Sequence, residues 1–308
     1  MFELRGKFQG RISGGGEKIV HGICGFCDDD IGREQNMSYF LRRVDGNIWH
    51  GKFSSLPEDL VIHAVSTRLG GVSGKPFDSL NLGLHVGDAA ENVLENRRLF
   101  MRTLGFRVED IVTPNQVHGD KIFVVDERHR GRGSRDYSDA IAETDALITN
   151  APNLPLMLCF ADCVPIFLVD VENRAIGLAH GGWKGTLNRI AAKTFRAMAE
   201  NFGTRAEDCL VGIAPSIGAC CYEIGENVRD DCAKSFPKNP ELIVERDGKN
   251  FLDLWRANKI QLEEVGVPAE NIDVAGECTC CNANFYFSYR AAGGTTGRIA
   301  AVIALRED

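Results

Sequence analysis

Apolar residues along most of this chain fall into short runs of strand length. Beyond residue 60 these runs are KIFVVD, DALITN, PLMLCFAD, PIFLVD, AIGLAH and RIAAVIAL. Short runs rich in branched aliphatic residues and bounded by turn residues are typical of buried or half-buried β-strands. All of them are too short to cross a bilayer as a helix, so we predict no contact with a membrane interior.

Three segments carry apolar residues at helical spacing instead. Asp88 and Glu91 resemble a capping box, and the apolar stripe that follows stops at Gly105. Thr186 is a second candidate N-cap, for a helix that ends near Gly203. We therefore expect helices over about 88–104, 186–202 and 252–265.

Strands and helices do not alternate as in βαβ units. This order favours an α+β fold, a mixed β-sheet core flanked by helices, over a doubly wound parallel sheet. Residues 61–308 are predicted to form one main catalytic domain. Residues 1–60 are Gly-rich and contain KIVHGI, YFLRRV and NIWHGKF, which predicts a small β-rich N-terminal extension of unknown function.

Composition narrows the class of protein. With 43 acidic and 35 basic residues the formal charge is −8, which argues against broad nucleic-acid binding. The basic segment ERHRGRGSR (127–135) is interpreted as a solvated surface loop or as a flap that attracts an anionic substrate.

Eleven cysteines in a chain this long, with no export-type apolar stretch at the N-terminus, indicate reduced thiols and a cytoplasmic location. Cys24 and Cys27 form a lone CxxC. They are two ordinary thiols, half of a zinc knuckle shared with a partner, or a redox pair.

Three residues at the ends of apolar runs are candidate metal ligands: His118 in QVHGD, Cys163 in FADCVP and His180 in LAHGGWKG. Two imidazoles and one thiolate suit zinc and, less well, copper. Three protein ligands leave one position open, which is the catalytic arrangement, and zinc can lower the pKa of a bound water to about 7. The alternative is three buried residues with a structural role.

The glycines after His180 indicate an anion site. Gly182, Lys184 and Gly185 precede a predicted helix, whose N-terminal N–H groups attract anions, and Lys184 adds a full positive charge. We predict phosphate here, with a plain tight turn as the alternative. Trp183 is either a stacking surface for a base or a core residue.

Eight motifs in one order resemble the laccase-domain family, first called polyphenol oxidase and now described as zinc-dependent purine nucleoside phosphorylase with adenosine deaminase activity. The resemblance covers about four-fifths of the chain, from Val61 to the C-terminus. The motifs are STRLGGVSGKPFDSLNLGLHVGD (66–88), ENRR (95–98), NQVHGD, TDALIT, CFADCVPIFLVD, GLAHGGWKGT, GIAPSIGACCYE (212–223) and CTCC…FYFSYRAAGGTTGR (278–298).

The resemblance implies that His118, Cys163 and His180 bind zinc. It also implies phosphorolysis of adenosine, inosine, guanosine and methylthioadenosine, with phosphate as co-substrate, and deamination of adenosine. The family usually has Ala-Gly-Trp-Arg-Gly after the second histidine, where this chain has Gly-Gly-Trp-Lys-Gly. Lysine keeps the charge but lacks the bidentate fork of arginine.

Further roles are predicted for residues in these motifs. Asp145 and Asp162 are candidates for acid–base catalysis, although a strand would point Asp162 away from the Cys163 side chain. Arg68 and His85 are candidates for contacts with phosphate or ribose. Arg290 and Arg298 are possible anion contacts. The cysteines of the last two motifs are buried thiols or a second metal site: Cys220, Cys221, Cys278, Cys280 and Cys281.

Three other functions fit parts of the pattern. Cys163 with a histidine base could form a cysteine hydrolase or amidase acting on cell-wall precursors. A copper phenol oxidase is disfavoured, because the chain has seven histidines and no HxH pair. The third possible function is that of an interaction module that binds a metal but has no catalytic activity. The sequence does not indicate an oligomeric state.

Overall fold

The computed structural model describes residues 38–307, and its main feature is two large β-sheets packed face to face. The first sheet is antiparallel throughout. In spatial order its strands are β1 (Tyr39–Asp45), β2 (Ile48–Phe53), β3 (Val61–Ser66), β14 (Ile299–Leu305) and β6 (Leu156–Phe160).

The second large sheet is mixed. Its four central strands are antiparallel, and a parallel strand is added at each edge. In spatial order it contains β13 (Ile272–Val274), β9 (Cys209–Ile213), β7 (Val164–Asp170), β8 (Ala175–Gly181), β5 (Ala146–Thr149) and β4 (Ile122–Val124). A small third sheet is formed by β10 (Glu223–Ile224), β12 (Lys249–Leu252) and β11 (Ile243–Arg246).

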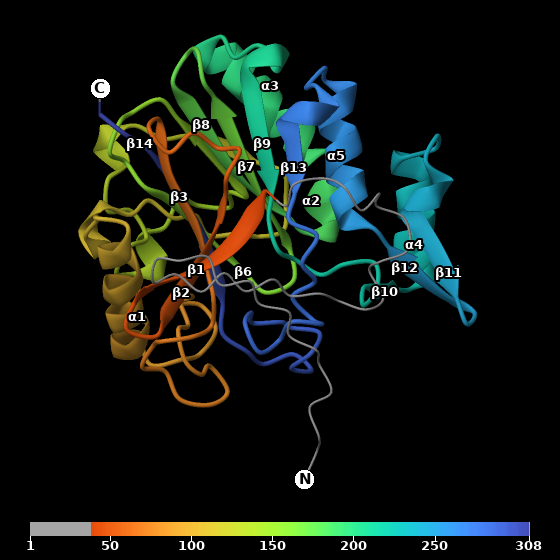
Figure 1. Cartoon of the computed structure of the whole chain (residues 1–308). Coiled ribbons are helices and arrows are strands. Elements are labelled where there is room, and N and C mark those ends of the chain that lie inside the picture. Colours follow the sequence, from red (N-terminus) through yellow and green to blue (C-terminus); the bar gives the residue numbers. More distant parts are fainter. Residues whose placement is uncertain (1–37, 308) are drawn as a thin grey trace, which may run out of the picture.

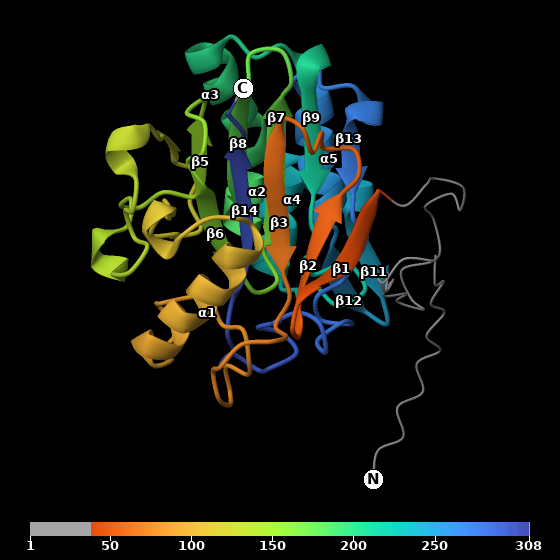
Figure 2. The ribbon, with the colours of Figure 1, turned by 60° about the vertical axis from the view of Figure 1, so that its left-hand side comes forward.

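Helices cover the outer faces of both large sheets, so the molecule has four layers (Figures 1 and 2). Along β7, Phe167 packs between the sheets, whereas Ile166 packs toward the helices on the outer face. Because both faces of β7 and β8 are buried, these strands are apolar without alternation. The helices are α1 (Ala90–Thr103), α2 (Trp183–Leu187), α3 (Ile190–Phe202), α4 (Glu226–Ser235) and α5 (Leu254–Glu264).

The predicted mixed α+β fold is confirmed, and the predicted strands between residues 38 and 307 are present. Helix starts are less well predicted. The N-cap of α1 is Ala89, which makes no side-chain cap. The predicted capping box that starts at Asp88 is therefore wrong. The Asp88 carboxylate instead accepts hydrogen bonds from Ser73 and Asn81, and these bonds hold the loop that precedes α1.

The predicted helix from Thr186 is two helices. Arg189 has a left-handed backbone (φ 68°), which separates α2 from α3. Thr186 is not a cap but lies buried inside α2, where its hydroxyl accepts a hydrogen bond from Asn258 on α5. The predicted end at Gly203 is correct, since that residue is the left-handed C-cap of α3. The third helix starts at an Asp253 cap, after Leu252 ends β12.

Strands β1 and β2 continue the first sheet beyond β3, with His50 paired to Ser66. The boundary predicted after residue 60 therefore falls between neighbouring strands, and the division into extension and catalytic domain stays a prediction. KIVHGI and the Cys24–Cys27 pair lie outside the described residues. Across residues 38–307, no helix is long and apolar enough to span a bilayer.

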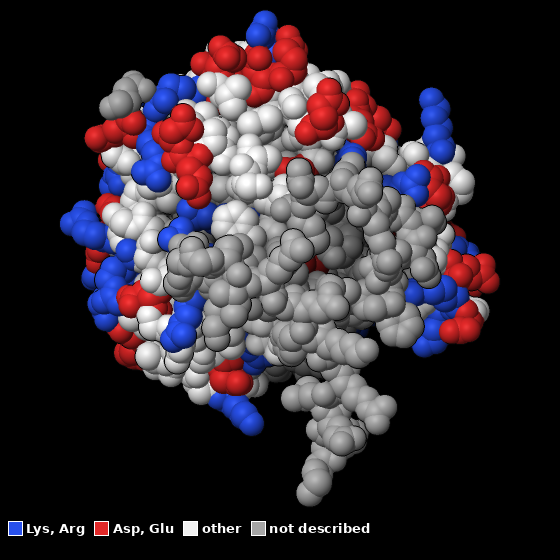
Figure 3. Space-filling view, viewed as in Figure 1, with Lys and Arg blue, Asp and Glu red and all other residues white. Residues whose placement is uncertain are grey.

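Charged side chains of both signs are interspersed around the face drawn in Figure 3. The basic segment 127–135 is also compensated locally, because each of its four arginines pairs with a carboxylate. The pairs are Arg128–Asp126, Arg130–Glu127, Arg132–Asp139 and Arg135–Glu109. These ion pairs favour the interpretation as a solvated loop.

Candidate active site

Strand pairing in the mixed sheet brings three predicted site residues together at one end of the neighbouring strands β7, β8 and β5. Cys163 immediately precedes β7, and His180 lies near the end of β8, where it pairs with Pro165. Asp145 immediately precedes β5, and its carbonyl oxygen accepts the His180 backbone N–H at 2.8 Å. The strand registers therefore place these side chains together although they are far apart in sequence.

Asp145 also holds the turn that carries His118. Its carboxylate accepts the backbone N–H groups of Val117, His118 and Gly119, at 3.2, 3.0 and 2.7 Å. The same carboxylate lies 2.8 Å from Nδ1 of His180. One fully buried carboxylate thus orients both histidines, which leaves Nε2 of His180 directed to the centre.

The potential ligand atoms of His118, Cys163 and His180 all lie within 4.8 Å of one another. Zinc–sulfur and zinc–nitrogen bonds of about 2.0–2.3 Å place tetrahedral ligands roughly 3.3–3.8 Å apart, so this donor set fits zinc. Gly182 lies against the centre. A Cβ at that position would be 3.1 Å from His118 Cδ2 and 3.3 Å from Cys163 Sγ.

Charges in the centre are strongly coupled. Burial raises the pKa of Cys163, but the charge of His180 and hydrogen bonds with both histidines outweigh it and lower the pKa to about 6. Burial lowers the pKa of His180, whereas Cys163 and Asp145 raise it to about 9. Burial also raises the pKa of Asp145, yet its bond with His180 makes the net shift downward. The centre therefore favours a thiolate without a metal as well.

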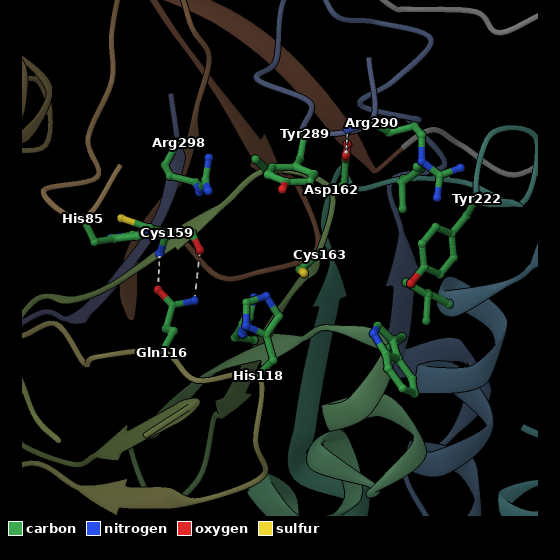
Figure 4. Close-up of a pocket in the computed structure, with 15 residues that line it drawn as sticks. His85, Gln116, His118, Cys159, Asp162, Cys163, Tyr222, Tyr289, Arg290 and Arg298 are labelled. Atoms are coloured by element: carbon green, nitrogen blue, oxygen red, sulfur yellow. Dashed lines mark hydrogen bonds between the residues drawn. The ribbon is translucent and has the colours of Figure 1, made fainter. Parts of the chain in front are cut away.

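A cavity of about 450 Å³ opens over the centre (Figure 4). This volume is in the range of small-molecule pockets. Its wall combines the candidate metal ligands with aromatic, apolar and cationic side chains. The lining residues are His85, Gln116, His118, Cys159, Ala161, Asp162, Cys163, His180, Trp183, Ile217, Tyr222, Leu254, Tyr289, Arg290 and Arg298.

Two cationic residues of the wall are fixed by backbone carbonyls. Arg290 donates to the carbonyl oxygens of Cys221 and Glu223, both at 2.9 Å. Arg298 donates to the carbonyl oxygens of Thr296 and Gly297, and burial lowers its pKa. The sequence singled out both arginines as possible anion contacts, and the structure places both on the cavity.

Asp162 lies in a turn and not in a strand, with a left-handed backbone (φ 87°). The strand alternation on which the expectation for Asp162 depended is therefore absent, and both Asp162 and Cys163 line the cavity. Its carboxylate accepts hydrogen bonds from Thr279 Oγ1 and from the Arg290 backbone N–H, both at 2.7 Å. These bonds tie the turn to the C-terminal loop.

The structure does not bring Arg68 to the cavity defined by the described residues. Its guanidinium donates to the carbonyl oxygens of Asp78 and Ala283 and lies 4.7 Å from the Phe287 ring centroid. His85 does line the cavity and stacks on Tyr137. Partial desolvation, followed by the charges of Arg298 and Arg97, lowers the pKa of His85 to about 4.

The glycine-rich segment after His180 has a packing role. A Cβ on Gly185 would lie 2.8 Å from the Gly119 carbonyl oxygen, so glycine lets α2 approach the turn that carries His118. Lys184 is exposed, with Nζ 5.5 Å from the Trp183 ring centroid, and is not among the described cavity residues. Trp183 does line the cavity.

Sequence reasoning missed several residues of the wall, notably Gln116, Cys159, Ile217, Tyr222 and Leu254. Gln116 bonds both backbone groups of Cys159, at 2.8 and 2.9 Å, and so joins the His118 segment to β6. Its position two residues before His118 was the available signal. Tyr222 lies within the motif GIAPSIGACCYE. In the structure, burial raises the pKa of its hydroxyl group.

A sequence profile described as "Multi-copper polyphenol oxidoreductase laccase" matches residues 62–306. The chain belongs to this family. It is 40% identical, over 80% of its length and 91% of the relative's, to a protein of Geobacillus stearothermophilus named purine nucleoside phosphorylase YlmD. It is 34% identical, over 77% of its length and 91% of the relative's, to adenosine deaminase RL5 from an unknown prokaryote.

Solved structures of the family share the fold. The crystal structure of YlmD from Geobacillus stearothermophilus superposes with a TM-score of 0.82 at 38% identity, covering 87% of this chain and 99% of that one. The crystal structure of the hypothetical protein YfiH from Bacillus licheniformis gives a TM-score of 0.81 at 35% identity, covering 86% and 98%.

Proposed function

We propose that this protein is a zinc-dependent purine nucleoside phosphorylase that also deaminates adenosine. The observation that carries the proposal is the convergence of His118, Cys163 and His180 on one wall of a cavity of nucleoside size. The names of family relatives, purine nucleoside phosphorylase and adenosine deaminase, support it.

Zinc held by these three residues would supply a Lewis acid that activates water or phosphate near neutral pH. Asp145 would keep the His180 imidazole in the tautomer that presents Nε2 to the metal. Because the Asp145 carboxylate is fully buried and accepts three backbone N–H groups, we propose that it positions the ligands and does not transfer protons.

Arg290 and Arg298 are the proposed phosphate contacts, since both residues line the cavity, whereas Lys184 is not among its lining residues. His85, neutral at pH 7 with a pKa of about 4, is proposed to contact ribose hydroxyls without adding charge. Trp183, Tyr222 and Tyr289 supply aromatic surface on which a purine ring can stack. Asp162 would hold the Arg290 backbone in place.

The direct test is turnover of inosine, adenosine and methylthioadenosine with and without phosphate. The proposal predicts phosphate-dependent release of the free base from each nucleoside and phosphate-independent conversion of adenosine to inosine. Both reactions should be lost in Cys163→Ala and retained in Cys232→Ala, which removes a buried thiol from α4. Intact nucleosides under all conditions would refute the proposal.

A cysteine hydrolase is the second candidate, favoured by the low pKa of Cys163 beside two histidines. Chelation separates the two functions, because a thiol hydrolase survives metal removal and is stopped by alkylation. A copper oxidase is less well supported. Within residues 38–307 the centre contains two histidines, fewer than a trinuclear copper cluster needs.

A further inference from the structure

A second group of thiols lies outside the proposed catalytic centre. The sulfur atoms of Cys220, Cys221, Cys278 and Cys281 all lie within 4.8 Å of one another. They come from two segments about 60 residues apart in sequence, and we refer to them as the four-thiol cluster. None of the four lines the cavity.

The sulfur separations match a metal site better than a disulfide. Cys281 Sγ lies 3.6 Å from Cys220 Sγ and 3.4 Å from Cys221 Sγ. A disulfide requires about 2.05 Å. Four sulfurs around a tetrahedral zinc ion, each about 2.3 Å from the metal, would be roughly 3.8 Å apart. Small adjustments of side-chain rotamers would close this difference.

The backbone allows adjacent cysteines to converge. Side chains of neighbouring residues diverge in a strand, but the segment with Cys220 and Cys221 is a turn, closed by N–H groups of Cys221 and Tyr222 that donate to the Gly218 carbonyl. Cys278 and Cys281 also share one helical turn, since the Asn282 N–H donates to the Cys278 carbonyl at 3.0 Å. Residues three apart lie on one face of such a turn.

One thiol already has a partner suited to a metal-bound thiolate. The backbone N–H of Gly218 donates to Cys278 Sγ at 3.3 Å, across the two segments. Such outer contacts orient the ligands of metal sites. Cys278 is fully buried and Cys281 is exposed, so the cluster extends from the interior to the surface and an ion can reach it.

We propose that the four-thiol cluster is a second, structural metal site that binds zinc. Four thiolates in tetrahedral reach are a donor set that zinc prefers, and with all positions filled by protein the site would be closed and not catalytic. The ion would join the turn 218–222 to the turn 278–282.

This site would order one wall of the cavity. Tyr222, which follows Cys221, lines the cavity, and Arg290 donates to the Cys221 carbonyl at 2.9 Å. Loss of the second ion should therefore lower thermal stability and weaken substrate binding while leaving the first ion in place.

Metal content of the full-length protein, purified under reducing conditions in zinc-containing buffer, tests the proposal. We expect two zinc ions per chain by elemental analysis. Cys281→Ser and Cys221→Ala should each retain one, bound at the Cys163 centre. Cys163→Ala should also retain one, bound at the cluster. Cys280→Ala is the matched control in the same turn and should retain both, since its sulfur is not one of the four.

Cobalt substitution adds a readout independent of activity. The strong thiolate-to-cobalt absorption of a tetrathiolate site should persist in Cys163→Ala and disappear in Cys281→Ser. A single equivalent in the wild type that is unaffected by cluster variants would overturn the proposal. A Cys221–Cys281 or Cys220–Cys281 disulfide in unreduced peptide maps would do the same, and iron in place of zinc would overturn the choice of ion. Because the metal content of Cys163→Ala is measured separately from that of the cluster variants, absence of metal from the cluster can be distinguished from absence of zinc from the proposed catalytic centre.

Discussion

At the scale of single residues, Asp145 explains how ligands from three separate segments hold one geometry. It bonds the His118 turn through three backbone N–H groups and His180 through Nδ1. A carboxylate can accept all of these bonds at once, whereas an amide offers one acceptor oxygen and one donor nitrogen. The centre therefore depends on a residue that does not itself face the cavity.

Asp145→Asn should weaken zinc binding about 10–100-fold. In the variant, the amide nitrogen would replace one acceptor oxygen and would face N–H donors. As a result, either the His180 ring would rotate or the turn that carries His118 would lose its hydrogen bonds. Competition with a chromogenic chelator measures the zinc affinity. Asp120→Asn is the control, since that carboxylate pairs with the partly exposed Lys193 nearby. Equal zinc affinity in both variants would contradict the orienting role of Asp145.

Gly182→Ala should reduce metal affinity and turnover while the fold is preserved. Its Cβ would be 3.1 Å from His118 and 3.3 Å from Cys163, close enough to push either ligand by a few tenths of an ångström. Gly74→Ala is the matched control, because a Cβ there meets nothing within 4 Å and its φ is not left-handed. Zinc titration and circular dichroism follow the two effects, and an unchanged metal affinity would show that the centre tolerates the methyl group.

Sequence reasoning went furthest at this scale where chemistry restricts the choice. Two imidazoles and a thiol at strand ends were recognisable, and the structure brings them together. Asp145 and Asp162 were found as carboxylates but not by their contacts, because those depend on strand register and on one left-handed turn. Arg68 occurs in a dense motif and binds backbone carbonyls instead of bordering the cavity.

At the scale of elements, helix α1 is joined to the rest of the fold by Arg97. This side chain is almost completely buried and donates to the carbonyl oxygens of Leu82, Gly133 and Ser134, at 2.9, 2.8 and 2.7 Å. It thus connects α1 with two loops far apart in sequence. The apolar period predicted a helix here but gave no role to Arg97.

Arg97→Met should lower the free energy of unfolding by at least about 2 kcal/mol, because it leaves three carbonyl groups without this donor in the interior. Arg98→Met on the same helix should change it by less than about 1 kcal/mol, since Arg98 is exposed and its ion pair with Glu95 lies on the surface. Urea unfolding measures both variants. Similar losses in the two would show that Arg97 is not the connection.

Caps and breaks were predicted less well than apolar stripes. Thr186 and Asp88 both have good N-cap side chains, yet each is used for a contact with another segment. The break at Arg189 depends on a left-handed backbone that a non-glycine residue seldom adopts. Tertiary contacts decide such positions, so local patterns could not predict them.

At the scale of the whole molecule, the first sheet carries buried histidines that are not part of the active site. His50 and His63 are almost completely buried, and burial, followed by the charge of Lys52, lowers their pKa values to about 4 and about 3. The unfolded chain, with histidine pKa values near 6.5, therefore binds more protons than the folded chain below that pH.

Stability should consequently fall as the pH drops from about 6.5 toward 4. The slope contributed by each histidine is at most about 1.4 kcal/mol per pH unit, and its contribution is fully present above pH 6.5. Urea unfolding at several pH values between 4.5 and 7 measures the slope. In His50→Phe the slope should be shallower, and an unchanged slope would mean that His50 does not titrate on unfolding.

The four-layer arrangement could be predicted only in part. Continuous apolar runs indicated buried or half-buried strands, and the absence of βαβ order indicated a mixed sheet. Which strands pair, and that β14 lies between β3 and β6, depends on contacts between opposite ends of the chain. The strands β1 and β2, assigned to an extension, belong to the first sheet, in which β1 is an edge strand and β2 lies between β1 and β3.

The most direct measurement is phosphorolysis of inosine by protein stripped of metal and then titrated with zinc. We expect no base release without metal, and activity that rises with zinc and saturates when the His118–Cys163–His180 centre is filled. Cys163→Ala should remain inactive at every zinc concentration. Full activity in the stripped protein, or in Cys163→Ala, would contradict the account.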